Sequence, residues 1–165
     1  LLEELRPFGL PVVAAGGIGT PEEFVRHLRM GYVAAQLGTR FIATKDAPVH
    51  QNVKDALVAA SELDTRLIMR PLRNTERVLN NAGVAKIIEK EKQLGAGVTF
   101  SDIVNEVAGV YPKVMKDGDM EAGAWSCGMV AGLIHDVPTV KELIDRIMRE
   151  ADEIISKRLT GALRA

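Results

Sequence analysis

Two glycine-bearing segments of this chain have the residue types that hold a phosphate group. The first reads Val-Val-Ala-Ala-Gly-Gly-Ile-Gly over residues 12–19, and the second reads Ala-Gln-Leu-Gly-Thr-Arg-Phe over residues 35–41. Gly16 and Gly17 let the backbone come close to a ligand, because no Cβ stands in the way. Backbone amides in such loops attract anions, and the hydroxyl of Thr39 can donate to the same phosphate. The two segments together predict a phosphate cradle.

The elements on either side of these loops should belong to a parallel α/β unit. Residues 12–15 and 33–36 are short apolar runs of the kind found in strands buried on both faces. Each strand ends at its glycine-bearing loop. A short helix beginning near Arg40 would add its free amides to the second loop.

A helix is predicted between the two strands, over residues 21–30. Thr20 and Glu23 have the spacing of a capping box, and Pro21 suits the first helical position. Because Pro21 has no N–H and Glu23 is negative, an anion should prefer the amides of Gly16 to Ile18 over this helix start. In (β/α)₈ barrels the loops after strands seven and eight often form such a phosphate site.

The rest of the chain has mostly helical patterns. Helical spacing or capping residues predict helices over residues 48–62, 75–80 with Asn74 as cap, 84–93, 102–108 with Ser101 as cap, and 139–157. Residues 67–69 form a short extended segment, and residues 112–116 form a turn or short helix. The organisation expected is therefore 1–46 for the last βα units with the phosphate site, 47–124 for a mostly helical insertion, and 125–165 for a return segment and final helix.

These segments resemble one known family. Ala-Ala-Gly-Gly-Ile-Gly followed by Ala-Gln-Leu-Gly-Thr-Arg-Phe resembles the FMN-phosphate region of the nitronate monooxygenases, formerly called 2-nitropropane dioxygenases, a family that also contains FMN-dependent enoyl-acyl-carrier-protein reductases. The resemblance extends through residues 72–75, 119–126 and 132–134. It implies an α/β fold, the C-terminal portion of a TIM (β/α)₈ barrel with a small helical insertion over its mouth. It also implies FMN as cofactor.

The same resemblance implies a set of FMN-binding residues. Gln36 could instead satisfy neighbouring backbone groups, and Gly16 with Gly17 could form only a tight turn. The family pattern favours cofactor contacts by Ala15, Gly16, Gly17, Ile18, Gln36, Leu37, Gly38 and Thr39.

The segment from Trp125 to Gly128 allows two readings. It could begin a helix, with Ser126 as a cap and Trp125 as a core anchor. Alternatively it could return to the barrel mouth and place Ser126 or Trp125 near the flavin ring, which makes Ser126 the candidate catalytic residue. Cys127 is not expected to be a nucleophile, because no histidine or cation is near it in sequence.

The remaining polar candidates have structural explanations. His135 beside Asp136 suggests acid–base chemistry, but a surface loop before Thr139 is the preferred interpretation. His27 and His50 are expected to be helix residues, and the three scattered histidines do not form a metal-binding pattern. Arg40 could complement a phosphate or pair with an acidic residue, and the sequence does not separate these roles.

Composition excludes several classes of protein. The 21 basic and 22 acidic residues leave a net charge of −1, which gives no long-range attraction for nucleic acid. No apolar run reaches the roughly 18 residues of a membrane span. No secretory leader is visible, although a segment preceding Leu1 would hide one. A single cysteine suits a reducing cytoplasm.

The chain is short for a complete barrel. Such barrels need about 250 residues, occasionally about 200, and this chain has 165. We therefore expect the C-terminal part of a longer enzyme. Members of the family carry their active-site histidine upstream of the segment matching Val12 to Ile18, and no residue here corresponds to it. Residues 1–165 alone should expose a large apolar surface, which a swapped or associated partner, such as a second copy in a homo-oligomer, would cover.

The function implied is FMN-dependent oxidation of a small molecule. The family implies that an alkyl nitronate is oxidised with O₂ to a carbonyl compound and nitrite. The enoyl-acyl-carrier-protein reductase branch is the first alternative, and a non-redox phosphate-binding barrel is the second.

Overall fold

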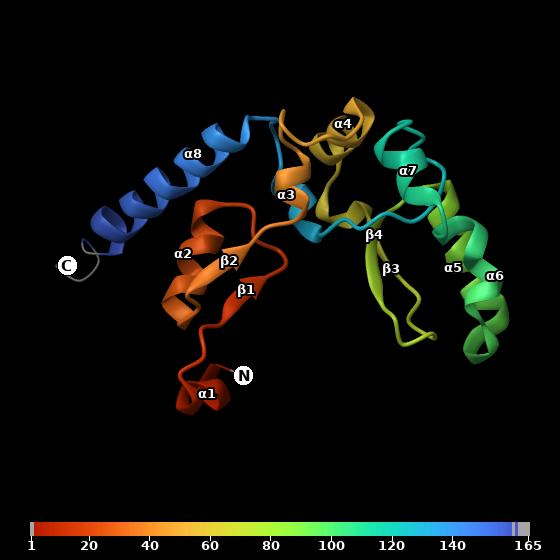
Figure 1. Cartoon of the computed structure of the whole chain (residues 1–165), viewed down its shortest axis with the longest axis horizontal. Coiled ribbons are helices and arrows are strands. Elements are labelled where there is room, and N and C mark those ends of the chain that lie inside the picture. Colours follow the sequence, from red (N-terminus) through yellow and green to blue (C-terminus); the bar gives the residue numbers. More distant parts are fainter. Residues whose placement is uncertain (1, 160, 162–165) are drawn as a thin grey trace.

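The computed structural model describes residues 2–159 and 161 and shows a mixed α/β chain (Figure 1). Its N-terminal part contains α1 (Leu2–Leu5), β1 (Val13–Ala15), α2 (Pro21–Met30), β2 (Ala34–Gln36) and α3 (Thr39–Ile42). The middle contains α4 (Gln51–Ala59), β3 (Thr65–Ile68), β4 (Glu76–Leu79), α5 (Ala82–Leu94), α6 (Phe100–Val107) and α7 (Val110–Met115). The last part contains the 3-10 helix η4 (Met129–Leu133), α8 (Val140–Glu153) and the π-helical turn η5 (Ile154–Leu159).

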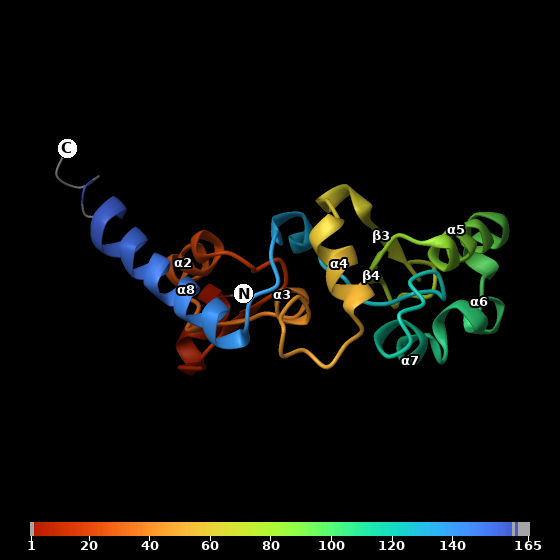
Figure 2. The same ribbon diagram turned by 90° about the horizontal axis from the view of Figure 1, so that it is seen from above.

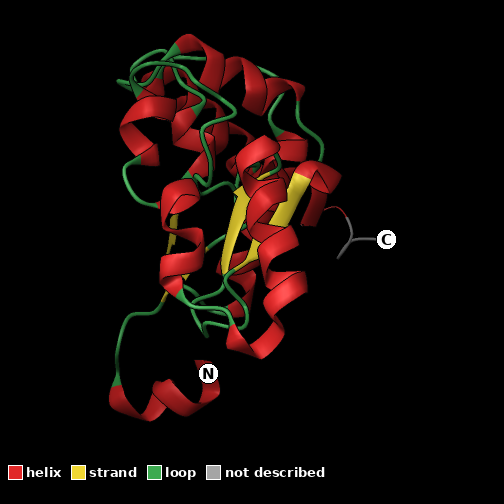
Figure 3. Cartoon of the chain, turned by 90° about the vertical axis from the view of Figure 1, so that its right-hand side faces the viewer, coloured by secondary structure: helices red, strands yellow, loops and turns green. Residues whose placement is uncertain are grey.

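The elements are spread along one long axis. Figures 1 and 2 show β1, β2, α2 and α8 at one end, and β3, β4, α5, α6 and α7 at the other. In both views α3 and α4 lie between these two groups. Figure 3 shows short strands among many helices, with the N-terminal helix apart from the rest.

The first unit has the predicted strand–loop–helix–strand order. β1 and β2 pair in parallel, with Val13 opposite Ala34 and Ala15 opposite Gln36. The capping box before α2 is formed: the Thr20 hydroxyl accepts from the Glu23 amide at 3.3 Å, and the Glu23 carboxylate accepts from the Thr20 amide. The two glycine-bearing loops therefore leave the same edge of the two-stranded sheet.

The second strand pair corrects one sequence prediction. Residues 75–80 are not a helix capped by Asn74, because β4 pairs antiparallel with β3. Val78 and Leu79 lie on opposite faces of the strand, as successive strand residues must, and each is buried in a different apolar cluster. The actual cap is Asn81, whose side-chain oxygen accepts from the Val84 amide at the start of α5.

Smaller differences concern helix ends. Ser101 does not cap α6; Thr99 occupies that position, and Asp102 accepts from the Thr99 amide at 2.8 Å. The helix predicted from residue 48 begins at Gln51, with His50 as its cap. The predicted extended segment near residue 67 and the capping box between Thr139 and Glu142 are confirmed.

Two apolar clusters form the core. One surrounds Trp125 and Leu57 between α4 and α7, and the other surrounds Ile68 and Ile87 between the β3–β4 hairpin and α5. The β1–β2 end has much less cover. Large apolar side chains are about half or more exposed there: Phe8 72%, Leu10 58%, Val13 49%, Met30 54% and Val33 60%.

No helix within the described part of the chain is both long enough and apolar enough to cross a membrane.

Candidate functional site

The first loop leaves an open space at the end of β1. Gly16 and Gly17 have φ of +94° and +71°, which side-chain-bearing residues rarely adopt, and a Cβ at either position would meet no atom within 4 Å. The amides of Gly16, Gly17 and Ile18 donate to no acceptor among the described residues. Gly19 differs from the first two glycines, because a Cβ there would overlap Val130. Packing explains Gly19, whereas nothing inside the described chain fills the space at Gly16 and Gly17.

The second loop faces the same space. Gly38 has an ordinary φ of −103°, and a Cβ there would also meet nothing within 4 Å. Thr39 begins α3, and its hydroxyl oxygen accepts from the Gly128 amide at 3.0 Å. This contact leaves the hydroxyl proton of Thr39 free to point elsewhere.

A pocket of about 590 Å³ joins the two loops to a wall formed by residues much later in the chain. Seven of the predicted cofactor residues line it, and Leu37 does not. The predicted residues that line the pocket are Ala15, Gly16, Gly17, Ile18, Gln36, Gly38 and Thr39.

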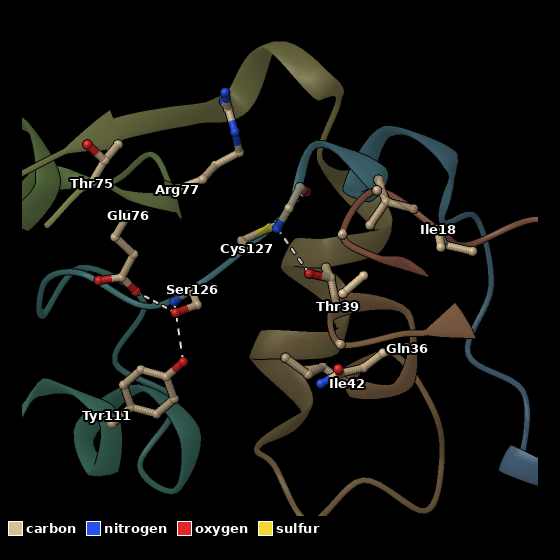
Figure 4. Close-up of a pocket in the computed structure, with 16 residues that line it drawn as sticks. Ile18, Gln36, Thr39, Ile42, Thr75, Glu76, Arg77, Tyr111, Ser126 and Cys127 are labelled. Atoms are coloured by element: carbon tan, nitrogen blue, oxygen red, sulfur yellow. Dashed lines mark hydrogen bonds between the residues drawn. The ribbon is translucent and has the colours of Figure 1, made fainter. Parts of the chain in front are cut away.

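The opposite wall is built on β4. Ser126 forms an isolated bridge with Val78, and the Cys127 amide donates to the Arg77 carbonyl at 3.0 Å. These contacts add residues 126 and 127 beside β4 as a short antiparallel pairing, which places residues 126–128 at the pocket. Figure 4 shows Glu76, Ser126 and Tyr111 grouped on this wall, across the pocket from Thr39 and Gln36.

Ser126 is therefore not a helix cap, which corrects one of its two interpretations. The Ser126 hydroxyl donates to Glu76 Oε1, and the Ser126 amide donates to the Tyr111 hydroxyl oxygen at 3.4 Å. The interpretation of Trp125 as a core anchor is confirmed, since its side chain is fully buried. Its indole N–H has no hydrogen-bond partner among the described residues.

Cys127 lines the pocket as a protonated thiol. Burial raises its pKa to about 12, because the charged thiolate is disfavoured away from water. This agrees with the expectation that Cys127 is not a nucleophile.

Arg40 belongs to an ion-pair network and not to the pocket. Its buried guanidinium donates to Asp136 Oδ1 at 2.6 Å, and Arg146 donates to Asp136 Oδ2 at 2.7 Å. The hydrogen bond from Arg146 is the main cause that lowers the pKa of Asp136, with the charge of Arg40 adding to it. The pairing role left open by the sequence is therefore the observed one, and Asp136 serves it while His135 is exposed.

The other histidines have structural contacts. His27 is in α2, where its Nδ1 lies 2.7 Å from the Glu23 carbonyl oxygen. His50 Nδ1 accepts from the Asn52 amide as the cap of α4. In the described part of the chain, no group of His, Cys, Asp and Glu residues could hold a metal ion.

Several pocket residues were not predicted from the sequence. Thr75, Glu76 and Arg77 were not predicted because a helix was expected over residues 75–80. A strand prediction would have placed them on an open sheet edge. Tyr111 gave no local signal beyond its polar aromatic type. The pocket residues missed are Ile42, Thr75, Glu76, Arg77, Tyr111, Cys127, Gly128 and Val130.

Comparison with protein families gives a match to the family described as nitronate monooxygenase over residues 3–150. Among curated relatives, the (3aS,4S,5R,7aS)-5-hydroxy-7a-methyl-1-oxo-octahydro-1H-indene-4-carboxyl-CoA dehydrogenase of Rhodococcus jostii (strain RHA1) is 29% identical, covering 94% of this chain and 53% of the relative. A probable nitronate monooxygenase of Staphylococcus aureus (strain MSSA476) is 24% identical, covering 88% of this chain and 40% of the relative. The chain thus spans about half the length, or less, of these relatives.

Two solved structures also match nearly all of this chain, and the match covers less than half of each of them. FabK from Thermotoga maritima superimposes with a TM-score of 0.84 at 32% identity, covering 93% of this chain and 47% of that chain. Nitroalkane oxidase from Streptomyces ansochromogenes superimposes with a TM-score of 0.69 at 26% identity, covering 93% of this chain and 43% of that chain.

Proposed function

This chain belongs to the nitronate monooxygenase family, and on that premise we propose that it supplies the phosphate-binding end of a (β/α)₈ barrel that uses FMN. The single observation that carries the proposal is the meeting of two glycine-bearing loops at one pocket. The loops come from successive βα units, as the phosphate loops of such barrels do. Residues 47–124 would then lie over the barrel mouth as an insertion.

The residues present fit an FMN phosphate. The amides at Gly16, Gly17 and Ile18 are free among the described residues, and the space in front of the two glycines is open. Free amides converging on a concave loop bind anions. The Thr39 hydroxyl, whose oxygen is already used by Gly128, can donate its proton to the same phosphate.

The roles of these residues follow from their positions. The first loop would hold the phosphate, with Gly38 leaving room on the other side. Gln36, exposed at the end of β2, would contact the cofactor where the strand meets the pocket. Arg40 would not bind the phosphate, since its guanidinium is already paired with Asp136.

The reaction we propose is oxidation of an alkyl nitronate. The redox chemistry would be supplied by bound FMN, through which electrons pass from the nitronate to O₂ to give a carbonyl compound and nitrite. The described residues would bind the cofactor and form one wall of the substrate site. The family's active-site histidine has no counterpart in this chain.

A second candidate is redox chemistry on a thioester. The dehydrogenase of Rhodococcus jostii, 29% identical to this chain, is named for a carboxyl-CoA compound. In that case reduced nicotinamide would be the electron donor and an enoyl thioester the acceptor. The pocket described above serves either reaction, because both need the same cofactor phosphate site.

Replacement of Gly17 by alanine tests the cofactor proposal. The added Cβ would stand in the space reserved for the phosphate. Gly9→Ala is the matched control, because Gly9 also has a positive φ, of +61°, and an open surrounding, but lies away from the pocket. Both changes carry a backbone strain of about 1–2 kcal/mol. We expect only Gly17→Ala to lower the flavin content of the purified holoprotein. Equal flavin content in the two variants would contradict the proposal.

The choice between the two reactions requires an assay. Holoprotein under air with propionate 3-nitronate or ethylnitronate should take up oxygen. The parallel measurement is anaerobic flavin reduction by NADH or NADPH, with an enoyl thioester as acceptor. Fast reduction by nicotinamide, with thioester turnover and without nitronate-dependent oxygen uptake, would favour the second candidate.

A further inference from the structure

The wall of the pocket opposite the glycine loops carries two hydroxyl groups, those of Ser126 and Tyr111. Both residues line the pocket and are joined by the hydrogen bond from the Ser126 amide to the Tyr111 oxygen. They come from different elements, Ser126 from the bridge to β4 and Tyr111 from α7. Their hydrogen bonds differ in a way that decides which of them can reach a substrate.

The Ser126 proton is already used. The Ser126 hydroxyl donates to Glu76 Oε1, and the backbone of Ser126 is fixed by its bridge to Val78. A hydroxyl has one proton to donate. Ser126 could donate to a substrate only by leaving Glu76 without this partner.

The Tyr111 proton is free. Its hydroxyl oxygen accepts from the Ser126 amide at 3.4 Å, so this contact does not use the proton. No described residue accepts a hydrogen bond from Tyr111. The side chain is half exposed, at 46% of the residue surface, and it borders the pocket. This proton is therefore available to solvent or to a ligand in the pocket.

The charges on this wall are mixed. Glu76 contributes one negative charge, and Arg77, the next residue along β4, contributes one positive charge. The Arg77 guanidinium is directed to the Thr65 hydroxyl, to which it donates at 2.8 Å. In Figure 4 the Arg77 side chain points away from Ser126 and Tyr111. A substrate oxygen next to these two residues would therefore take its hydrogen bond from a neutral donor, and Tyr111 supplies one.

We propose that Tyr111 is the hydrogen-bond donor that holds an oxygen atom of the substrate, with Ser126 and Glu76 as positioning residues. This rests on the proposed function, because the substrate is the one that meets the bound flavin. The ligand chemistry is an oxygen that carries negative charge, either a nitronate oxygen or a thioester carbonyl oxygen during reduction. Hydrogen bonds to such oxygens are stronger than those between neutral groups.

The test uses three variants of the holoprotein. Tyr111→Phe removes the hydroxyl and keeps the ring. Tyr32→Phe is the matched control, because Tyr32 is the only other tyrosine and is absent from the pocket lining, with its ring against His27. Ser126→Ala removes the hydroxyl bound to Glu76 and keeps the amide that contacts Tyr111. Flavin content is measured first for each.

Each variant is then measured with two substrates and with two unreactive ligands that serve as binding probes. Propionate 3-nitronate with O₂ and crotonyl-CoA with NADH give kcat and KM. Calorimetry with 3-nitropropionate and with butyryl-CoA gives binding without turnover. For one of the two substrate types we expect Tyr111→Phe to lower kcat/KM by about tenfold or more, and to weaken binding of the matching probe, whose oxygen is uncharged, by a smaller factor. Flavin content should match wild type, Tyr32→Phe should behave as wild type, and Ser126→Ala should lose less than Tyr111→Phe.

The outcomes separate the two proposals. A wild-type protein that binds no flavin would contradict the proposed function, while the calorimetric comparison would still decide the role of Tyr111. Unchanged probe binding in Tyr111→Phe, or no probe binding by the wild type, would overturn the inference. Loss of flavin in Tyr111→Phe, or an equal or larger loss in Ser126→Ala, would overturn it as well.

Discussion

The hydroxyl oxygen of Thr39 accepts a hydrogen bond from the Gly128 amide at 3.0 Å, although the two residues are 89 positions apart. Thr39 belongs to the second glycine-bearing loop, and Gly128 follows the stretch that carries Ser126. The bond therefore ties the proposed phosphate loop to the wall proposed for the substrate. We expect Thr39→Val to weaken both flavin binding and substrate binding, since one side chain serves both walls. Thr39→Ser should retain both. Flavin titration and steady-state kinetics measure the two effects. A Thr39→Val variant that is less stable but binds flavin and substrate like wild type would contradict this role.

Gly38→Ala tests whether the open space at Gly38 is needed for cofactor binding and not for folding. Gly38 has an ordinary φ, and its added methyl would touch no atom within 4 Å. We therefore expect the melting temperature to stay near wild type while the flavin dissociation constant rises by about tenfold, equivalent to about 1.4 kcal/mol. Gly97→Ala, equally open but outside the pocket, is the control. Identical flavin affinity in the two variants would contradict the placement of the cofactor at Gly38.

Asp136 should contribute to stability in a pH-dependent way. Its pKa is lowered in the folded chain, chiefly by the hydrogen bond from Arg146. A carboxyl group with a depressed folded-state pKa stabilises the fold above its unfolded value, near about 3.9. This stabilisation is lost as pH falls through the folded value. Asp136→Asn should therefore cost about 1.5–3 kcal/mol at neutral pH, because Arg40 stays buried without its charged partner.

The control for Asp136 is Asp145→Asn. Asp145 pairs with Lys141 on the exposed face of α8, where such pairs contribute about 0.3–0.5 kcal/mol. Chemical denaturation at neutral pH and below pH 4 measures both variants. Equal losses in the two variants, or an Asp136→Asn loss that persists unchanged in acid, would contradict the network described here.

Cys127 should resist alkylation in the native state. Its pKa of about 12 leaves a thiolate fraction of about one in ten thousand at pH 8. Iodoacetamide labelling followed by mass spectrometry should be slow in buffer and fast in denaturant, where the thiol titrates normally. Fast labelling of the folded protein would show that this thiol is accessible and activated.

The strand and helix order near the N-terminus was predictable because local signals and packing agree there. Thr20, Glu23 and Pro21 define the start of α2 by their own chemistry, and the short apolar runs on either side are strands, as their length favours. Only the β3 half of the β3–β4 hairpin was predicted, because Asn74 has the chemistry of a helix cap but lies in the connection before β4. What makes residues 76–79 a strand is distant packing of Val78 and Leu79 against two separate clusters, which no local pattern shows.

The candidate site was predictable on one wall only. Glycine type and spacing indicate the two loops proposed to bind phosphate, since a close approach of ligand and backbone requires the absence of a side chain. The opposite wall depends on the bridge between Ser126 and Val78, which connects residues 48 positions apart and leaves no trace in local sequence. Arg40 illustrates the same limit, because its partner Asp136 is 96 positions away.

Residues 1–165 expressed alone should associate. Val13, Val33 and Met30 are about half or more exposed at the β1–β2 end, and Ile144 and Met148 of α8 are about half exposed. Exposed apolar area of this kind favours association or partner binding. Sedimentation analysis should show self-association or capture of a partner. A monomer with one sharp, cooperative melting transition would contradict this expectation.

FMN binding at the two glycine-bearing loops is tested by the visible absorbance spectrum of the purified holoprotein, followed by extraction and identification of the released chromophore. We expect flavin bands, a released cofactor that is FMN, and weaker bands in Gly17→Ala but not in Gly9→Ala. A colourless protein that takes up no added FMN, or one whose flavin content is unchanged by Gly17→Ala, would contradict it.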